Sequence, residues 1–227
     1  MTLSVPSYVI PGTYLENLQW LEANSAIRHV ELLFFIFDEE ASTLLSRELA
    51  GLREYSEAFR FTAHLPDRLV PGHERLVENL AGFVDAFVTH PPPPVKDQSD
   101  FVSLINAWRR RYGVDRFLLE NTRLSWFEPT DSAFLDSTLG SPHVCADLGH
   151  LLLEGVDPVT WTGHYADRIT EIHLHGLSEG RDHVSFNGSE EWFNRMEPFF
   201  RIFQGIAEIE LFSWADLQPA LLALGRF

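Results

Sequence analysis

Short runs of hydrophobic residues alternate with longer amphipathic segments along the whole chain. Residues 29–37 form a strongly apolar run that predicts a buried strand, and Asp38 can cap a helix predicted over residues 39–58. The same pattern predicts further strands over residues 7–10, 59–66, 86–90, 116–121, 143–148, 169–176 and 206–212. Helices are also predicted over residues 14–23, 74–84, 101–112 (capped by Ser99 or Asp100), within 125–139, after Asp157, from a Ser189 cap to residue 204, and from a Ser213 cap to residue 224.

Eight strands that alternate with eight helices, at about 28 residues per unit, are what a (β/α)8 TIM barrel requires. A doubly wound open sheet is the competing fold, but it uses fewer strands and more often has a glycine-rich turn after the first one. The segment PGTYLEN at residues 11–17 is not such a turn. We therefore expect a single-domain α/β TIM barrel over residues 1–227.

Charge and cysteine content narrow the classes of function. Seventeen Lys and Arg residues against 33 Asp and Glu residues give a formal net charge of −16, which disfavours nucleic acid as a partner. The one cysteine, Cys145, excludes an internal disulfide and suits a reducing compartment. Without a recognisable signal peptide or an apolar run long enough to span a membrane, the sequence predicts a cytoplasmic protein, and its oligomeric state stays open.

Side chains that bind metals recur where the predicted strands end. The stretches HVCADLGH (143–150) and ITEIHLHG (169–176) show this best, because Asp147 shares a strand face with Cys145, and His173 shares one with His175. A TIM barrel gathers its strand ends around one active site. The candidate ligands at or after strand ends are His64, His90, Glu120, Asp147, His150, His173 and Glu210, joined by Asp182 and His183 from the loop after the seventh strand.

Such a set of imidazoles and carboxylates predicts divalent metal ions, namely zinc, manganese or iron. Unpaired carboxylates gathered at one end of the barrel would repel one another, and bound cations would remove this repulsion. Three further residues are candidates for contacting substrate or for holding a ligand in place: Glu31, Asn121 and His175. For Glu31 a buried, satisfied carboxylate is an equally good interpretation, and for His175 plain loop packing is.

The ordered set of ligands resembles the xylose isomerase-like superfamily, which includes sugar isomerases, epimerases and endonuclease IV. The strings SYVIPGTYLEN, VELLFF, ADLGHLLLEGVDP, IHLHGLSEGRDHVSF and IELFSWADL are similar to one branch, the cobamide-remodelling phosphodiesterases. That resemblance implies hydrolysis of the nucleotide-loop phosphodiester of a cobamide, a small-molecule substrate, by two or three bound metal ions. Glu120 and Glu210 would then be catalytic and would bridge ions or orient water.

Two alternatives remain at this point. A sugar isomerase or epimerase of the superfamily needs one ion, for which Glu120, Asp147, His173 and Glu210 suffice. A barrel that binds a small molecule without catalysis is the other alternative. The surplus histidines His64 and His90 favour the endonuclease-like arrangement with further metals. In that arrangement one residue separates the loop Asp from the loop His, whereas here they are adjacent, which puts the third metal in question.

Overall fold

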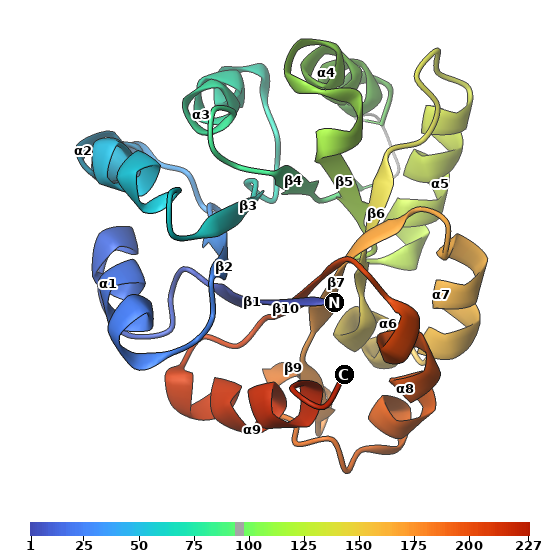
Figure 1. The fold of residues 1–227 in the computed structure, drawn as a ribbon. Helices are drawn as coiled ribbons and strands as arrows, with labels where there is room; N and C mark the ends of the chain where they lie inside the picture. Colours follow the sequence, from blue (N-terminus) through green and yellow to red (C-terminus); the bar gives the residue numbers. More distant parts are fainter. Residues whose placement is uncertain (94–97) are drawn as a thin grey trace.

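The computed structural model describes residues 1–93 and 98–227. Within these residues, eight parallel strands close into a barrel in the order β1-β10-β7-β6-β5-β4-β3-β2 (Figure 1). This confirms the predicted TIM barrel. The strands are β1 (Thr2–Pro6), β2 (His29–Leu33), β3 (Arg60–His64), β4 (Ala86–Thr89), β5 (Phe117–Glu120), β6 (His143–Asp147), β7 (Ile169–Leu174) and β10 (Ile206–Ile209).

Helices surround the barrel and bury their apolar faces against the outer sides of the strands (Figure 1). Asp38 and Ser213 cap α2 and α9 as predicted, each accepting a hydrogen bond from a backbone N–H in the first turn. The helices are α1 (Tyr14–Asn24), α2 (Glu39–Tyr55), α3 (Glu74–Leu80), α4 (Gln98–Tyr112), α5 (Leu124–Leu135), α6 (Leu148–Leu153), α7 (Pro158–Tyr165), α8 (Glu191–Ile202) and α9 (Trp214–Leu224), with short 3-10 turns at Pro71–His73 and Val114–Arg116.

The first strand lies earlier in the chain than predicted. Residues 7–10 do not form a strand, because the backbone N–H groups of Val9 and Ile10 both donate to the side chain of Asn17 instead of to a neighbouring strand. Ser7, just after β1, accepts a hydrogen bond from the Leu33 N–H through its hydroxyl. The apolar run at residues 7–10 is therefore a loop that closes over the end of β1.

Two predicted helix caps are also wrong. Helix α8 begins after Glu190, whose carboxylate accepts from the N–H groups of Asn187 and Gly188, while the N–H of Ser189 donates to the side chain of Asn187. Helix α4 is already helical at Gln98, so Ser99 and Asp100 lie in its first turn and do not precede it.

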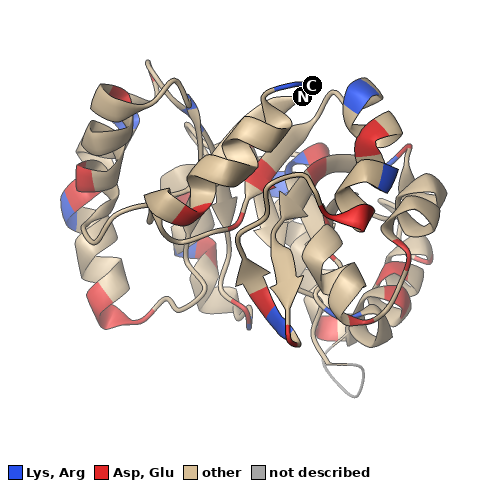
Figure 2. Cartoon of the chain, turned by 90° about the horizontal axis from the view of Figure 1, so that it is seen from below, with Lys and Arg blue, Asp and Glu red and all other residues tan. Residues whose placement is uncertain are grey.

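The segment after β7, predicted as a polar loop, folds into an antiparallel hairpin of β8 (Gly176–Ser178) and β9 (Arg181–Val184). Glu179 and Gly180 form its turn, both in the left-handed region of the backbone with φ of 52° and 75°. Figure 2 shows the hairpin on the side of the barrel away from the two chain termini, where the strands have their carboxyl ends. The hairpin thus stands beside the mouth of the barrel.

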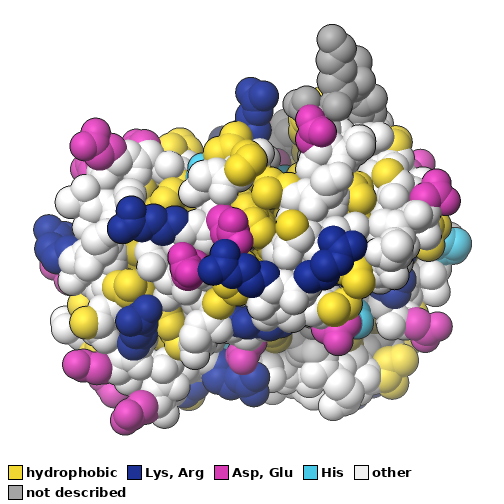
Figure 3. Space-filling model, turned by 90° about the horizontal axis from the view of Figure 1, so that it is seen from above, with side chains coloured by type: hydrophobic (Ala, Val, Ile, Leu, Met, Phe, Trp, Pro, Cys, Tyr) yellow, Lys and Arg dark blue, Asp and Glu magenta, His cyan; other side chains and the backbone are white. Residues whose placement is uncertain are grey.

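Charged residues are spread over the outer helices (Figure 2). On the face drawn in Figure 3, basic side chains alternate with acidic and hydrophobic ones, without a continuous basic surface. Among the helices that the structure describes, none is long and apolar enough to cross a membrane.

Candidate metal centre

Eight of the nine predicted metal ligands meet inside the mouth of the barrel. Six of them occupy the last residues of a strand or follow it directly: His64, His90, Glu120, Asp147, His173 and Glu210. His150 joins them from α6 and His183 from β9. We call these eight residues the mouth cluster.

Glu120 lies at the centre of the mouth cluster and is 1% exposed. Its Oε2 is 2.9 Å from His64 Nε2 and 3.2 Å from His90 Nε2. Its Oε1 faces the other way, 3.5 Å from His150 Nδ1. Asp67 contacts the far nitrogen of His90, at 3.2 Å. Glu120 therefore has imidazole rings next to both of its carboxylate oxygens.

Asp147 ends β6 and begins α6, which fixes its carboxylate. Its Oδ1 accepts the backbone N–H of His150 at 2.7 Å, and its Oδ2 lies 3.1 Å from His150 Nδ1. Asn121, a candidate for substrate contact, is buried and uses its amide in two hydrogen bonds to the backbone N–H and carbonyl of Asp147. Asn121 thus fixes the backbone that carries Asp147.

His173 connects the mouth to the interior below it. Its Nδ1 is 3.5 Å from Glu210 Oε2 and 3.7 Å from Glu120 Oε2, and its Nε2 is 3.6 Å from Glu31 Oε2. Both ring nitrogens are buried without a hydrogen-bond partner among the described residues. A carboxylate behind the far nitrogen of a histidine is the arrangement that orients metal-binding imidazoles in proteins.

His175 fills the space that a glycine leaves. A Cβ at Gly149 would lie 2.0 Å from His175 Cε1, so the glycine of the sequence DLGH makes room for this ring. The His183 N–H donates to His175 Nδ1 at 3.0 Å, and His175 Nε2 lies 3.3 Å from Asp147 Oδ1. This geometry favours His175 as a residue that holds Asp147 in place.

Asp182 is the predicted ligand that does not join the cluster. Its carboxylate is 40% exposed and contacts the neighbouring His183, with Oδ1 3.3 Å from Nδ1. His183 has a left-handed backbone, with φ of 52°, and points its Nε2 to within 3.4 Å of Glu210 Oε2. The turn of the backbone between two adjacent residues sends one side chain into the mouth and leaves the other at the rim.

Two buried carboxylates that sequence reasoning missed lie one layer below the mouth cluster. Glu171 and Glu208 stand two residues before His173 and Glu210 on the same strands, and both are 0% exposed. We call them, with Glu31, the deep carboxylates. Both oxygens of Glu31 and of Glu208 lack a hydrogen-bond partner within the described chain, while Glu171 accepts one from the hydroxyl of Thr62 at 3.2 Å. The sequences EIH (171–173) and EIE (208–210) could have revealed them, because residues two apart on a strand point to the same face.

The two layers hold their protons differently. Burial alone raises the pKa of Glu120, but His90, His150 and His64 outweigh it and hold the pKa well below its usual range. Burial raises the pKa of Glu171 to about 8, with a further contribution from Glu31, and the same causes raise the pKa of Glu208 well above its usual range. At neutral pH the mouth carboxylates Glu120, Asp147 and Glu210 are therefore ionised, whereas Glu171 and Glu208 keep a proton.

Imidazoles supply the balancing charge in the mouth. Burial lowers the pKa of His90, His150 and His183, but neighbouring carboxylates outweigh this effect and raise the pKa to about 10, about 9 and about 9. The main neighbours are Glu120 for His90 and Asp147 for His150. Metal ions bind deprotonated imidazole, so a divalent ion would replace these protons.

The donor set of the mouth cluster fits divalent ions. Asp147 Oδ2, His150 Nδ1, His173 Nδ1 and Glu210 Oε2 are buried and have no hydrogen-bond partner in the part of the chain that the structure describes. Such orphaned atoms are costly unless an unplaced ion or water satisfies them. Sets of three donor atoms within 4.8 Å of one another include His64–Glu120–His173, Asp147–His173–Glu210, Asp147–His150–His175 and His175–His183–Glu210. Nitrogen and oxygen donors of this kind suit zinc, manganese or iron.

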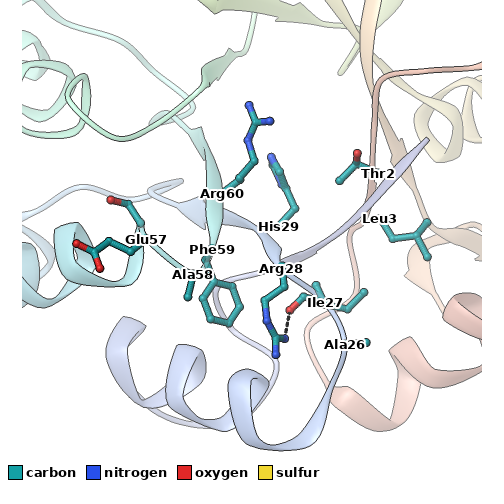
Figure 4. A pocket seen from close by; sticks show the side chains of 11 residues that line it. Thr2, Leu3, Ala26, Ile27, Arg28, His29, Glu57, Ala58, Phe59 and Arg60 are labelled. Carbon is teal, nitrogen blue, oxygen red and sulfur yellow. Dashed lines mark hydrogen bonds between the residues drawn. The ribbon is translucent and has the colours of Figure 1, made fainter.

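A separate cavity of about 510 Å³ opens at the opposite end of the barrel (Figure 4). His29 and Arg60 lie side by side in it, at the starts of β2 and β3. Arg60 pairs with Asp85 at 2.9 Å, and Arg28 donates to the carbonyls of Ser25 and Ile27. These polar groups are used within the fold, and TIM-barrel active sites lie at the other end. Cys145 is buried against Val88 and Leu118, as expected for a small core residue.

Comparisons with known proteins agree on the fold. No family model matches the chain, and no curated protein does. Solved structures do match over nearly the full length of both chains. 3-Keto-D-glucoside 4-epimerase from Escherichia coli is 15% identical with a TM-score of 0.67 and covers 99% of this chain and 97% of its own. An AP endonuclease of family 2 from Brucella melitensis is 12% identical, with a TM-score of 0.65 and coverages of 100% and 98%.

Endonuclease IV from Thermus thermophilus is 16% identical with a TM-score of 0.60, and the match covers 99% of this chain and 98% of that one. At these identities the likeness shows the fold alone. The chain has the TIM-barrel fold that these sugar epimerases and endonucleases share, in agreement with the xylose isomerase-like resemblance of the sequence.

Proposed function

We propose that the protein is a metal-dependent hydrolase that cleaves a phosphoester of a small metabolite, and that its preferred substrate is the nucleotide-loop phosphodiester of a cobamide. The observation that carries the proposal is the position of Glu120, with His64 and His90 on one carboxylate oxygen and His150 on the other. A carboxylate with imidazoles on both oxygens would serve a site with more than one ion, whereas a sugar isomerase of this superfamily needs one.

Each residue of the mouth cluster has a role in this proposal. His64, His90 and Glu120 would hold one ion, and Asp147, His173 and Glu210 would hold a second. His150 and His183 would be donors for a third. Such ions would supply a water nucleophile at neutral pH and neutralise charge on the phosphoryl oxygens. Glu120 and Glu210 have pKa values well below the usual range, so both stay ionised and can accept hydrogen bonds from a water molecule that they orient.

A sugar isomerase or epimerase with a single ion is the second candidate. One ion would need only four ligands, namely Glu120, Asp147, His173 and Glu210. The carboxylates of Glu120 and Glu210 lie within 3.7 Å and 3.5 Å of His173 Nδ1. Under this alternative His64 and His90 would be hydrogen-bonding partners of Glu120 and would bind no ion. The likeness in fold to 3-keto-D-glucoside 4-epimerase is compatible with it.

Nucleic acid is not the proposed substrate. The formal charge of −16 disfavours contact with a phosphate backbone. We expect no duplex DNA binding at physiological salt and no incision at abasic sites, measured by gel shift and gel electrophoresis with endonuclease IV as positive control. Efficient incision at low enzyme concentration would refute this part of the proposal.

The test is incubation of the metal-loaded protein with a reduced cobamide, followed by chromatography for a cobinamide and a riboside phosphate. His64→Ala should reduce this release by on the order of 10², because one ion is lost. Excess zinc or manganese should restore part of it. His164→Ala, which changes an exposed histidine of α7, is the matched control and should behave as wild type.

Three outcomes separate the candidates. Release of cobinamide by the wild type that falls in His64→Ala supports the proposal. No release, together with interconversion of free ketoses, would replace it with the isomerase. No turnover and no bound metal after reconstitution would identify a barrel that binds a small molecule without catalysis.

A further inference from the structure

An apolar cavity of about 450 Å³ lies beside the mouth cluster. Its walls come from the end of β2, from the loops after β1, β2 and β10, from the start of α1 and from the second turn of α2, so it opens at the same end of the barrel as the cluster. Its hydrophobic lining residues are Tyr8, Tyr14, Leu33, Phe35, Leu44 and Phe212.

Two of these residues also contact the metal-ligand histidines. The ring of Phe35 packs against the ring of His64 at 4.4 Å between centroids, and the ring of Phe212 stacks on that of His183 at 5.5 Å. Phe35 and Phe212 meet edge to face at 6.5 Å. A molecule bound at the mouth cluster therefore has this cavity directly beside it.

Two polar side chains of the cavity, Ser7 and Tyr14, are used within the fold. The hydroxyl of Ser7 accepts from the Leu33 N–H, and the hydroxyl of Tyr14 donates to the Leu33 carbonyl. Burial raises the pKa of Tyr14 to about 12, with a further contribution from Glu48, so its phenol stays neutral. Among the described lining residues none carries a charge. The cavity thus favours an uncharged, apolar group.

The aromatic walls are open to solvent. Tyr8 is 44% exposed and Phe212 is 37% exposed, although both are large hydrophobic side chains next to a candidate active site. Ligand cavities in proteins have volumes of roughly 300–1,000 Å³ and mostly apolar linings. Flat rings stack on aromatic side chains at little entropic cost. The volume and the lining match a fused ring system of two or three rings.

We propose that this cavity binds a flat, uncharged ring system of the substrate while the phosphoester lies against the mouth cluster. The inference rests on the proposed phosphoesterase function for the position of the phosphoester. It makes the substrate a phosphodiester of a ring-bearing metabolite, and it excludes sugar phosphates that have only hydroxyl groups to offer this surface.

The experiment measures binding without turnover. Isothermal titration calorimetry on the metal-loaded protein compares naphthylmethylphosphonate with methylphosphonate, which carry the same anion and cannot be hydrolysed. The wild type should bind the naphthyl compound at least about tenfold more tightly, since burial of a ring of this size contributes on that order. Leu44→Glu, which places a charge in the cavity, should remove this preference, and Tyr8→Ala should reduce it.

Leu222→Glu, at a side chain of α9 that is 82% exposed, is the matched control and should keep the preference. Circular dichroism checks that each variant is folded. If Leu44→Glu does not fold, Tyr8→Ala alone serves as the cavity variant. Equal affinities for the two phosphonates in the wild type, or a preference that persists in both cavity variants, would overturn the inference. If the wild type does not cleave a cobamide in the separate assay, the proposed function is refuted, but the preference for the naphthyl compound can still be measured.

Discussion

Two buried glutamates near the end of the same strand differ in charge state, one in the mouth cluster and one among the deep carboxylates. Glu210 has a depressed pKa, whereas Glu208, two residues earlier on β10, has a raised one. Burial acts on both, but histidines surround the first and the carboxylate of Glu31 faces the second. Neighbours within a few ångströms, more than depth in the barrel, decide which carboxylates are available to a cation.

The largest expected difference between the two layers is in catalysis. Glu120→Gln keeps the shape of the side chain and removes its charge, so cobamide turnover should fall by on the order of 10² or more. Glu208→Gln resembles the protonated acid already present and should leave turnover within about twofold of the wild type. Steady-state kinetics of the two variants, with metal content measured on the same samples, checks the pair. Full activity in both Glu120→Gln and His64→Ala would rule out the hydrolase with several metals.

The deep layer should reveal itself in the pH dependence of stability. Glu171 keeps its proton in the folded state up to a pKa of about 8, whereas the unfolded chain releases it near 4.5. Its contribution to stability is therefore present at low pH and is lost as the pH rises through this window. Glu171→Gln has no proton to release, so at neutral pH it should be more stable than the wild type by about 3 kcal/mol.

Urea unfolding of the metal-free protein at several pH values measures this difference. The two curves should coincide near pH 4.5 and separate above it. Parallel curves across the window would mean that Glu171 is ionised in the folded protein.

Glu31 connects the layers, and its replacement should have an intermediate effect. If its carboxylate orients His173 from behind, Glu31→Gln should weaken metal binding by about 10–100-fold while the ligands themselves remain. Competition with a fluorescent chelator gives the affinity, and Glu208→Gln is the control, because Glu208 is in the same layer but forms no ion pair with a histidine among the described residues. Unchanged metal affinity in Glu31→Gln would show that His173 is held by other contacts.

The smallest effect is expected at the rim. Asp182 contacts only His183 among the mouth residues, so Asp182→Asn should change turnover and metal content by no more than about twofold. His183→Asn, at the adjacent position whose ring reaches Glu210, should lower the number of bound ions. A larger loss in Asp182→Asn than in His183→Asn would mean that the hairpin adopts another geometry when metals bind.

The sequence allowed the barrel and most of the mouth cluster to be predicted for one reason. Strand ends of a TIM barrel converge, so His64, Glu120 and Asp147 could be placed together from their positions alone. The same rule directed attention away from the middle of the strands, where Glu171 and Glu208 lie. Their alternation with His173 and Glu210 was visible, but nothing in it indicates whether an interior carboxylate has a partner.

Local backbone geometry was the part that could not be predicted. Asp182 and His183 are equally plausible ligands by residue type, and the left-handed conformation of His183 decides between them. The strand expected at residues 7–10 failed similarly, because the side chain of Asn17 takes the N–H groups of Val9 and Ile10 that a strand would need. Neither the side-chain hydrogen bonds of Asn17 nor the left-handed backbone of His183 has a signal in the pattern of hydrophobic and polar residues.

Anomalous scattering from crystals of the protein reconstituted with zinc or manganese tests the central claim most directly. The account predicts two or more ions per chain, one beside His64, His90 and Glu120 and another beside Asp147, His173 and Glu210. A single ion bound by Glu120, Asp147, His173 and Glu210, with His64 and His90 directed elsewhere, would contradict it.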